Sequence, residues 1–295
     1  MKKKLLAVLI SAAMVMAMLS GCSQSQQTTA KEYAVKTITP GVLTVALSPD
    51  FAPMEFVDTS KTGQDQYVGF DVFLAKFLAE DMGLTLEIKP MGFEACQAAC
   101  QAGAVDMAIS GFSYLPERAE NFNLSDYYHA GDNETSQIII TGAANEGKLT
   151  KAEDYSGKTV GAQTASLQMN YCKTQLPSDA IIKEYGSIDT AIEALRNGQI
   201  DAVAVAEGNG NVIINQVPGL IKTGFEFNVD EAEEDNLILL QKGNDELTKA
   251  VNASLAKADA AGYYPKWYAD AQELAGLDTA EEVVIEDESE SGSGN

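Results

Sequence analysis

The sequence predicts an α/β fold with two similar lobes, in which helices flank the faces of mainly parallel sheets. One observation is the alternation of strand and helix patterns along the first third of the chain. A second is the echo of one helix-to-strand junction about ninety-five residues further on. The chain has 295 residues, the length of about two ordinary domains, and its 45% hydrophobic content favours a globular body.

The alternation begins with the apolar run at residues 42–47. Apolar side chains then recur at the helical period over residues 70–82, with Gly83 placed to end the helix. Residues 84–88 alternate as a strand, residues 93–102 form a second helix, and residues 105–109 read as a strand. The order strand, helix, strand, helix, strand predicts a parallel sheet whose ligands bind beyond the carboxyl ends of its strands.

The second half repeats this plan. Residues 157–163 and 199–205 read as strands, and residues 188–195 as an amphipathic helix between them. Residues 103–109 and 198–204 share one pattern: Gly, any residue, a β-branched residue, Asp, then an apolar strand. Taken at face value, this echo predicts a second α/β lobe similar to the first.

A last strand and helix follow the second lobe. Residues 237–241 read as the strand, and residues 247–258 as a helix that Gly262 ends. An aromatic cluster just beyond it is expected to pack the helix end onto a lobe; its members are Tyr263, Tyr264, Trp267 and Tyr268.

The N-terminus has the pattern of a secretory signal. Three lysines precede a short apolar run, and the run ends in Leu19-Ser20-Gly21-Cys22. This ending resembles the bacterial lipobox, in which the Cys is lipidated and becomes the first mature residue. Cys22 is therefore the predicted lipidation site, and the Gln-, Ser- and Thr-rich segment after it is the predicted tether.

Charge and cysteine content exclude several classes of function. A net charge of −23 argues against nucleic-acid binding, because no basic patch can form that would displace counterions. Besides Cys22, Cys96, Cys100 and Cys172 remain, an odd number that cannot make a complete disulfide framework. Cys96 and Cys100 share a helix face, but no matching ligands lie near them in sequence, so we expect buried core residues and no metal site.

The stretch from Val105 to Arg118 has the equipment to hold a carboxylate. A strand pattern opens into Ser110-Gly111-Phe112-Ser113, which offers hydroxyls and backbone N–H groups, and Arg118 follows on a turn begun by Pro116. A guanidinium matches two carboxylate oxygens with its rigid fork of donors. From spacing alone, a solvated surface charge is still the favoured interpretation of Arg118.

From Gly41 to about Leu277 the sequence resembles the polar amino-acid class of solute-binding proteins that feed ABC importers, the family 3 extracellular solute-binding proteins. Five segments carry the resemblance in the family's order: residues 48–56, 68–72, 105–122, 124–128 and 157–161. The resemblance implies a two-lobed periplasmic-binding-protein-like clamp of type II, joined by two crossover segments. It also implies an extracytoplasmic protein anchored by lipid to the bacterial cell membrane.

The implied organisation assigns every part of the chain. We expect a signal peptide at residues 1–21, a lipidated flexible tether at 22–40, lobe 1 at 41–134 and 232–278, lobe 2 at 135–231, and a disordered acidic tail at 279–295. The implied partners are a small-molecule solute, with an amino acid favoured, and an ABC permease in the membrane. The chain is expected to act as a monomer without a cofactor.

The resemblance also implies the ligand-binding residues, and it reverses the interpretation of Arg118. Phe51 and Phe93 resemble the rings that sandwich the ligand, and Arg118 resembles the guanidinium that holds its carboxylate. The remaining implied contacts are Ser48, Ser110, Gly111, Ser113, Gln163, Ser166, Leu167 and Glu207.

Three positions depart from the family's pattern. Ala206 stands where many members have an Asp that pairs the ligand's α-ammonium, Ser48 stands at the other acidic position, in the first loop of some members, and Leu167 replaces a small or hydroxyl residue. An ammonium buried without a carboxylate costs several kcal/mol. Glu207, Asp50 or Glu55 is therefore expected to take over the role; the alternative is a ligand that is not an ordinary α-amino acid.

Two other functions remain open at this stage. The first alternative is an enzyme on the same clamp, such as a dehydratase-like protein, which needs an acid or base in the cleft. The single His, His129, falls near the first crossover and is not expected to touch substrate. The second alternative is an extracellular sensor module, which would normally continue into a transmembrane segment and a signalling domain.

Overall fold

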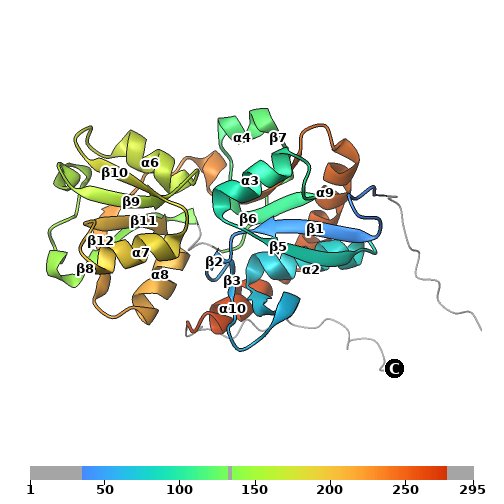
Figure 1. The fold of residues 1–295 in the computed structure, drawn as a ribbon, viewed down its shortest axis with the longest axis horizontal. Helices are drawn as coiled ribbons and strands as arrows, with labels where there is room; N and C mark the ends of the chain where they lie inside the picture. Colours follow the sequence, from blue (N-terminus) through green and yellow to red (C-terminus); the bar gives the residue numbers. More distant parts are fainter. Residues whose placement is uncertain (1–34, 132–134, 278–295) are drawn as a thin grey trace, which may run out of the picture. The chain divides into compact units, whose positions relative to one another are not determined.

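The computed structural model describes residues 35–131 and 135–277. The predicted signal peptide, Cys22, most of the tether and the acidic tail lie outside these residues. Within them, the strands form two five-stranded sheets and a small three-stranded sheet, with helices beside them (Figure 1). None of the described helices is both long and apolar enough to cross a membrane.

The first large sheet has the strand order β5-β1-β6-β13-β7. Its strands are β1 (Val42–Leu47), β5 (Thr85–Pro90), β6 (Met107–Ser113), β7 (Phe122–Leu124) and β13 (Asn236–Gln241). β1 pairs in parallel with β5 and β6, whereas β13 runs antiparallel to β6 and β7. The predicted mainly parallel sheet is therefore parallel in three strands, and the late strand β13 makes the rest of it antiparallel.

The second large sheet has the same plan, in the order β10-β9-β11-β8-β12. Its strands are β8 (Gln137–Gly142), β9 (Thr159–Gln163), β10 (Ile181–Tyr185), β11 (Ala202–Ala206) and β12 (Leu220–Glu226). β9 pairs in parallel with β10 and β11, and β8 runs antiparallel to β11 and β12. The small sheet joins β2 (Asp50–Phe51), β3 (Glu55–Val57) and β4 (Tyr67–Val68).

Helices cover both faces of each large sheet. On the first sheet, α2 (Phe70–Asp81), α9 (Asp245–Ala260) and α10 (Tyr263–Leu274) pack on one face, and α3 (Phe93–Gln101) packs on the other. On the second sheet, α6 (Leu167–Gln175) packs on one face, and α7 (Ile188–Arg196) and α8 (Glu207–Gln216) on the other (Figure 1). Strand residues alternate between the two faces, as the pleat requires. The two-lobed α/β fold is thus confirmed, while the exact lobe boundaries stay a prediction.

Several predictions for individual elements are confirmed. Cys96 and Cys100 are buried in the core between α3 and its sheet, and Cys172 is a buried free thiol as well. The predicted aromatic cluster does pack onto the first lobe, where Tyr264 and Trp267 contact the ring of Phe70. Its residues belong to a helix of their own, α10, which the pattern did not reveal. The short turn at Pro116 is likewise a helix, α4 (Pro116–Asn121).

Asp106 and Asp201, the Asp residues of the repeated junction pattern, make equivalent hydrogen bonds in the two sheets. Asp106 accepts a hydrogen bond from Thr44 N–H at 2.7 Å, and Asp201 accepts one from Thr159 N–H at 2.8 Å. In both cases the Asp backbone N–H returns a bond to the same residue's carbonyl, at 3.0 and 2.9 Å. Each Asp therefore fastens the chain entering one strand to the neighbouring strand. This is why β6 and β11 begin after the Asp, later than predicted.

The second oxygen of Asp106 fastens a segment that was expected to be tether. Ile38 N–H donates to Asp106 Oδ1 at 2.8 Å, and Val35 packs against the first core. The described residues before Gly41 are therefore held on the first lobe, which corrects the tether boundary at residue 40. The composition of residues 35–40 could not show that the buried carboxylate of Asp106 would accept a hydrogen bond from this segment.

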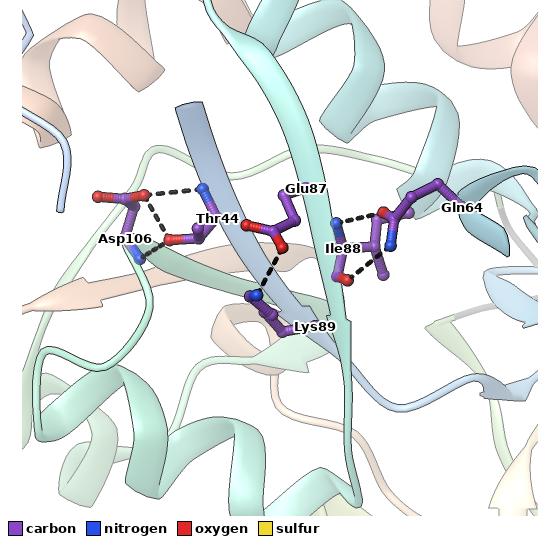
Figure 2. Close-up of polar contacts among 6 residues, drawn as sticks. All are labelled: Thr44, Gln64, Glu87, Ile88, Lys89 and Asp106. Carbon is purple, nitrogen blue, oxygen red and sulfur yellow. Dashed lines mark hydrogen bonds and ion pairs between the residues drawn. The ribbon is translucent and has the colours of Figure 1, made fainter. Parts of the chain in front are cut away.

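The edge strand β5 is protected by a side-chain amide. Gln64 accepts from Ile88 N–H at 2.7 Å and donates to Ile88 C=O at 3.2 Å, while Lys89 pairs with Glu87 along the same strand (Figure 2). Gln64 thus occupies backbone groups that a foreign strand could otherwise pair with, and the charges discourage such pairing.

Because the two Asp residues differ in burial, their removal should have unequal effects. The Asp106 residue is 4% exposed, whereas the Asp201 side chain is 37% exposed. Asp106→Ala leaves the N–H groups of Ile38 and Thr44 without an acceptor, so we expect it to lower the free energy of unfolding by about 3 kcal/mol. Asp201→Ala should cost less than half as much in urea denaturation. Equal losses would contradict this account of Asp106.

Candidate functional site

A cavity lies where the carboxyl ends of several strands meet the first turns of several helices. Its lining includes nine of the eleven predicted contacts, which are Phe51, Phe93, Ser110, Gly111, Ser113, Arg118, Gln163, Ser166 and Leu167. The other lining residues are Gln168, Ile188, Ala204, Val205 and Ala206. The structure therefore brings together residues of both large sheets, as the clamp predicts; their roles as ligand contacts stay a proposal.

Arg118 is a buried cation. It is 3% exposed, and its guanidinium lies over the neighbouring rings of Phe93 and Phe112, at 5.6 and 5.2 Å from their centroids. Its terminal nitrogens donate to Ser113 C=O at 2.6 Å and Ala165 C=O at 2.9 Å. Burial lowers the pKa of Arg118 to about 10, so the group remains charged at neutral pH.

The guanidinium has spare donors. Nε–H makes a long contact of 3.4 Å to the side chain of Gln97, so two of the five N–H groups, one on each terminal nitrogen, have no acceptor among the described residues. Its partners within the described residues are carbonyls, an amide and aromatic rings, and none is a carboxylate. An anion in the cavity would supply both the missing charge and the missing acceptors.

Ser110 and Gly111 lie within β6, not in a loop beyond it, which corrects the expectation that they follow the strand. The pairing of β6 with β13 shifts here, because residues 109–111 oppose a single residue of β13. Gly111 has φ +54, and a Cβ at this position would lie 2.8 Å from the ring of Phe51. Only glycine therefore fits this β-bulge, and the bulge turns the chain toward the cavity.

The polar groups of this bulge bind a buried pair of acids. The Ser110 hydroxyl donates to Glu55 Oε1 and accepts from Ser48 N–H at 3.0 Å. Gly111 N–H donates to Asp71 at 2.7 Å. The predicted use of these two groups to hold a carboxylate is therefore wrong in this arrangement, because both donors already have acceptors behind the cavity wall. Sequence spacing could not show that Glu55 and Asp71 lie there.

Glu55 and Asp71 form a buried pair of acids that we expect to hold one proton between them at neutral pH. Glu55 Oε2 is buried without a hydrogen-bond donor, and the Asp71 carboxyl lies where it can accept a proton from it. Burial and the neighbouring charge of Asp71 raise the pKa of Glu55 well above its ordinary value, and burial raises the pKa of Asp71 to about 6. Tyr128 donates to Asp71 at 2.9 Å, which helps to hold its charge.

The second sheet contributes Gln163, Ser166 and Leu167. Ser166 begins α6 by accepting from Met169 N–H at 3.0 Å, so its own proton is free for a ligand. Gln163 donates to Asp50 at 3.0 Å, and Ile188 N–H at the start of α7 donates to the same Asp50 oxygen at 2.8 Å. Asp50 thus links the loop after β1 to the second sheet.

Two predicted contacts and His129 lie away from the cavity lining. Ser48 is buried beside Ser110 and donates its hydroxyl to Asp50 at 2.8 Å. Glu207 pairs with Lys222 at 2.6 Å. His129 is half exposed and contacts Asp235 at 2.7 Å. Among the described residues, no group of three or more acidic, His or Cys side chains could hold a metal ion.

Five lining residues are absent from the predicted contacts, and four of them are apolar; of these, the sequence points to Ala206 only as a departure from the family's pattern. Ala204, Val205 and Ala206 close β11, and Ile188 is the first residue of α7. The rule that ligands bind at the carboxyl ends of parallel strands could have pointed to the end of β11, but it gave no reason to choose particular apolar residues. Gln168 is held in place by Gln137, to which it donates at 2.6 Å.

Comparison with known proteins decides the family. The model of the bacterial extracellular solute-binding proteins, family 3, matches residues 43–271. The chain belongs to this family. The arginine-binding extracellular protein ArtP of Bacillus subtilis is 28% identical over 265 residues, which cover 90% of this family 3 chain and 96% of ArtP.

Solved structures of other proteins share the fold. The amino acid ABC transporter substrate-binding protein AbpA of Streptococcus pneumoniae, bound to L-arginine, has a TM-score of 0.72 and 30% identity, covering 81% of this chain and 97% of that one. An ancestral arginine-binding protein bound to glutamine has a TM-score of 0.70 and 29% identity, covering 79% and 98%. AbpA is thus a transporter component that binds an amino acid, and ArtP and the ancestral protein are arginine-binding proteins.

The shared proton of Glu55 and Asp71 predicts a pH dependence of stability. A carboxyl whose pKa is raised on folding stabilises the folded state only while protonated, so the free energy of unfolding should fall as pH rises from 3.8 to about 6 and beyond. Glu55→Gln should flatten this fall, because Gln accepts from Ser110 and donates to Asp71 at every pH. Urea denaturation between pH 4 and 7 measures the difference. The exposed Glu94→Gln is the control, and a curve for Glu55→Gln parallel to wild type would refute the shared proton.

Proposed function

We propose that this chain is the solute-binding lipoprotein of an ABC importer and captures an amino acid or a similar small carboxylate between its two lobes. The observation that carries the proposal is Arg118, a buried guanidinium in the cavity without a carboxylate partner among the described residues. A buried charge without a partner of opposite sign costs several kcal/mol, so a carboxylate ligand that pairs with Arg118 would offset this cost. The family and its relatives support a transport role.

The mechanism is capture without catalysis. The solute carboxylate binds the spare N–H groups of Arg118, and the hydroxyls of Ser113 and Ser166 complete its contacts. The rings of Phe51 and Phe93 cover its body. Bonds across the lobes, such as those from Arg118 to Ala165 and from Gln163 to Asp50, form when the lobes close around it. Closure then favours delivery to a membrane permease, because the solute binds the closed state more tightly than the open one.

Location and assembly form part of the same proposal. The signal sequence directs the chain out of the cytoplasm, and lipid on Cys22 anchors it to the outer face of the cell membrane. The protein acts as a monomer. An enzymatic role has little support, because the cavity holds no His and its neighbouring acids are engaged by Ser, Gln, Tyr or Lys partners.

Arg118 provides the direct test of capture. Arg118→Ala should abolish the thermal stabilisation that a bound solute confers, which is about 2.7 kcal/mol at a hundredfold excess over the dissociation constant. Arg118→Lys keeps the charge but loses the fork, so it should weaken binding at least tenfold. A screen of amino acids and related carboxylates by thermal shift provides the ligand.

The matched control is Arg196→Ala, the other arginine of the chain, which lies exposed on α7. It should bind the solute as wild type does. Undiminished binding by Arg118→Ala would refute the role of the guanidinium.

Lipid anchoring has its own test. In a bacterial host that processes lipoproteins, Cys22→Ala should release the protein from the membrane fraction, because no lipid can then be attached. Ser23→Ala is the control and should stay in the membrane fraction. A membrane-bound Cys22→Ala protein would contradict the anchor without affecting the proposal for the cavity.

A further inference from the structure

The charges at the cavity lining are all positive. Arg118 supplies a full positive charge, and four helices begin at the lining: Phe93 starts α3, Leu167 starts α6, Ile188 starts α7, and Ala206 caps α8. Helix N-termini carry a partial positive charge, so they favour an anion and disfavour a cation. No carboxylate is among the described residues that line the cavity.

The nearest carboxyl groups are already engaged. Glu55 is fully buried, accepts from Ser110 and shares its proton with Asp71. Glu207 pairs with Lys222 at 2.6 Å, and Lys222 also pairs with Glu226 at 2.7 Å. The three acids expected to bind an α-ammonium were Glu207, Asp50 and Glu55, and none of them lines the cavity.

Asp50 is the acid that comes nearest to serving a cation. One of its oxygens accepts from the Ser48 hydroxyl at 2.8 Å, and the other accepts from Gln163 at 3.0 Å and from Ile188 N–H at 2.8 Å. Three donors therefore hold Asp50 already, and Asp50 is not among the described residues that line the cavity, so an ammonium in the cavity would have no direct contact with this carboxylate. Burial raises the pKa of Asp50, which agrees with a carboxyl that lacks a cationic partner.

From this charge distribution we infer that the cavity takes a small monocarboxylate with a neutral, largely apolar body and no ammonium on its α-carbon. The inference rests on the proposed capture function and names its substrate class. The carboxylate pairs with Arg118, and the apolar body lies among Phe51, Phe93, Leu167 and Ile188. An α-amino acid would bring an ammonium into a desolvated site that offers it only neutral acceptors.

Matched pairs of compounds test the inference. Isothermal titration of the purified full chain compares L-alanine with L-lactate, L-leucine with 2-hydroxy-4-methylpentanoate, and L-phenylalanine with 3-phenyllactate. Each pair differs only at the α-substituent. We expect at least one hydroxy acid to bind at least about tenfold more tightly than its amino partner, a difference of about 1.4 kcal/mol.

A substitution at the cavity wall should reverse the preference. Ala206→Asp places a carboxylate at the lining and gives α8 a better N-cap, so the variant should fold and bind the amino acid of a pair more tightly than the hydroxy acid. Ala206→Asn, equal in size but uncharged, should keep the wild-type preference. Circular dichroism and thermal melting verify the fold of both variants.

The outcomes separate the inference from the function on which it rests. An amino acid that binds wild type more tightly than its hydroxy partner would overturn the inference and leave solute capture standing; loss of that binding in Asp50→Asn would then identify the acid that serves the ammonium. Failure of every amino acid and every hydroxy acid to bind would overturn carboxylate capture itself. Reversal in Ala206→Asp, with none in Ala206→Asn, would support the inference directly.

Discussion

The site depends on keeping one guanidinium charged inside the protein. Arg118 is held by two aromatic rings and by the carbonyls of Ser113 in β6 and Ala165 in the turn before α6, and these partners stabilise a cation without neutralising it. A carboxylate in their place would make a better buried ion pair and a poorer receptor, because it would occupy the donors that a ligand needs. The bulge in β6, the ring of Phe93 on α3, the ring of Phe112 on β6 and the turn before α6 all serve this arrangement.

The two sheets solve one folding problem in the same way. In each, an Asp after a helix fastens the incoming chain to the neighbouring parallel strand, β1 or β9, through a reciprocal pair of hydrogen bonds. As a result, the strand that follows each Asp begins in a fixed register, and its carboxyl end lies at the cavity. β6 delivers Ser110 and Gly111 in this way, and β11 delivers Ala204 to Ala206.

Patterns along the chain were enough to predict the large elements, whereas the residues of the site came from the resemblance to the family. Helical period and glycine stops located α2, α3 and α7 within a residue or two, because burial on one face dictates that spacing. Spacing could not reveal which donors were already taken. Ser110 and Gly111 had the right chemistry for a carboxylate, but Glu55 and Asp71, far away in sequence, occupy them. Glu207 was misplaced for a related reason, since its partner Lys222 lies on β12 and no local pattern connects the two.

The contacts of Asp50 affect how efficiently a permease could distinguish solute-bound protein from protein without solute. Its bonds to Gln163 and to the first turn of α7 join the lobes through protein groups alone, without a solute between them. Whatever stability these bonds give to the joined state is given equally to protein that carries nothing. If a permease recognises joined lobes, protein without solute competes with solute-bound protein for the same docking surface. The strength of the Asp50 contacts then sets the fraction of permease molecules that are occupied by protein without solute.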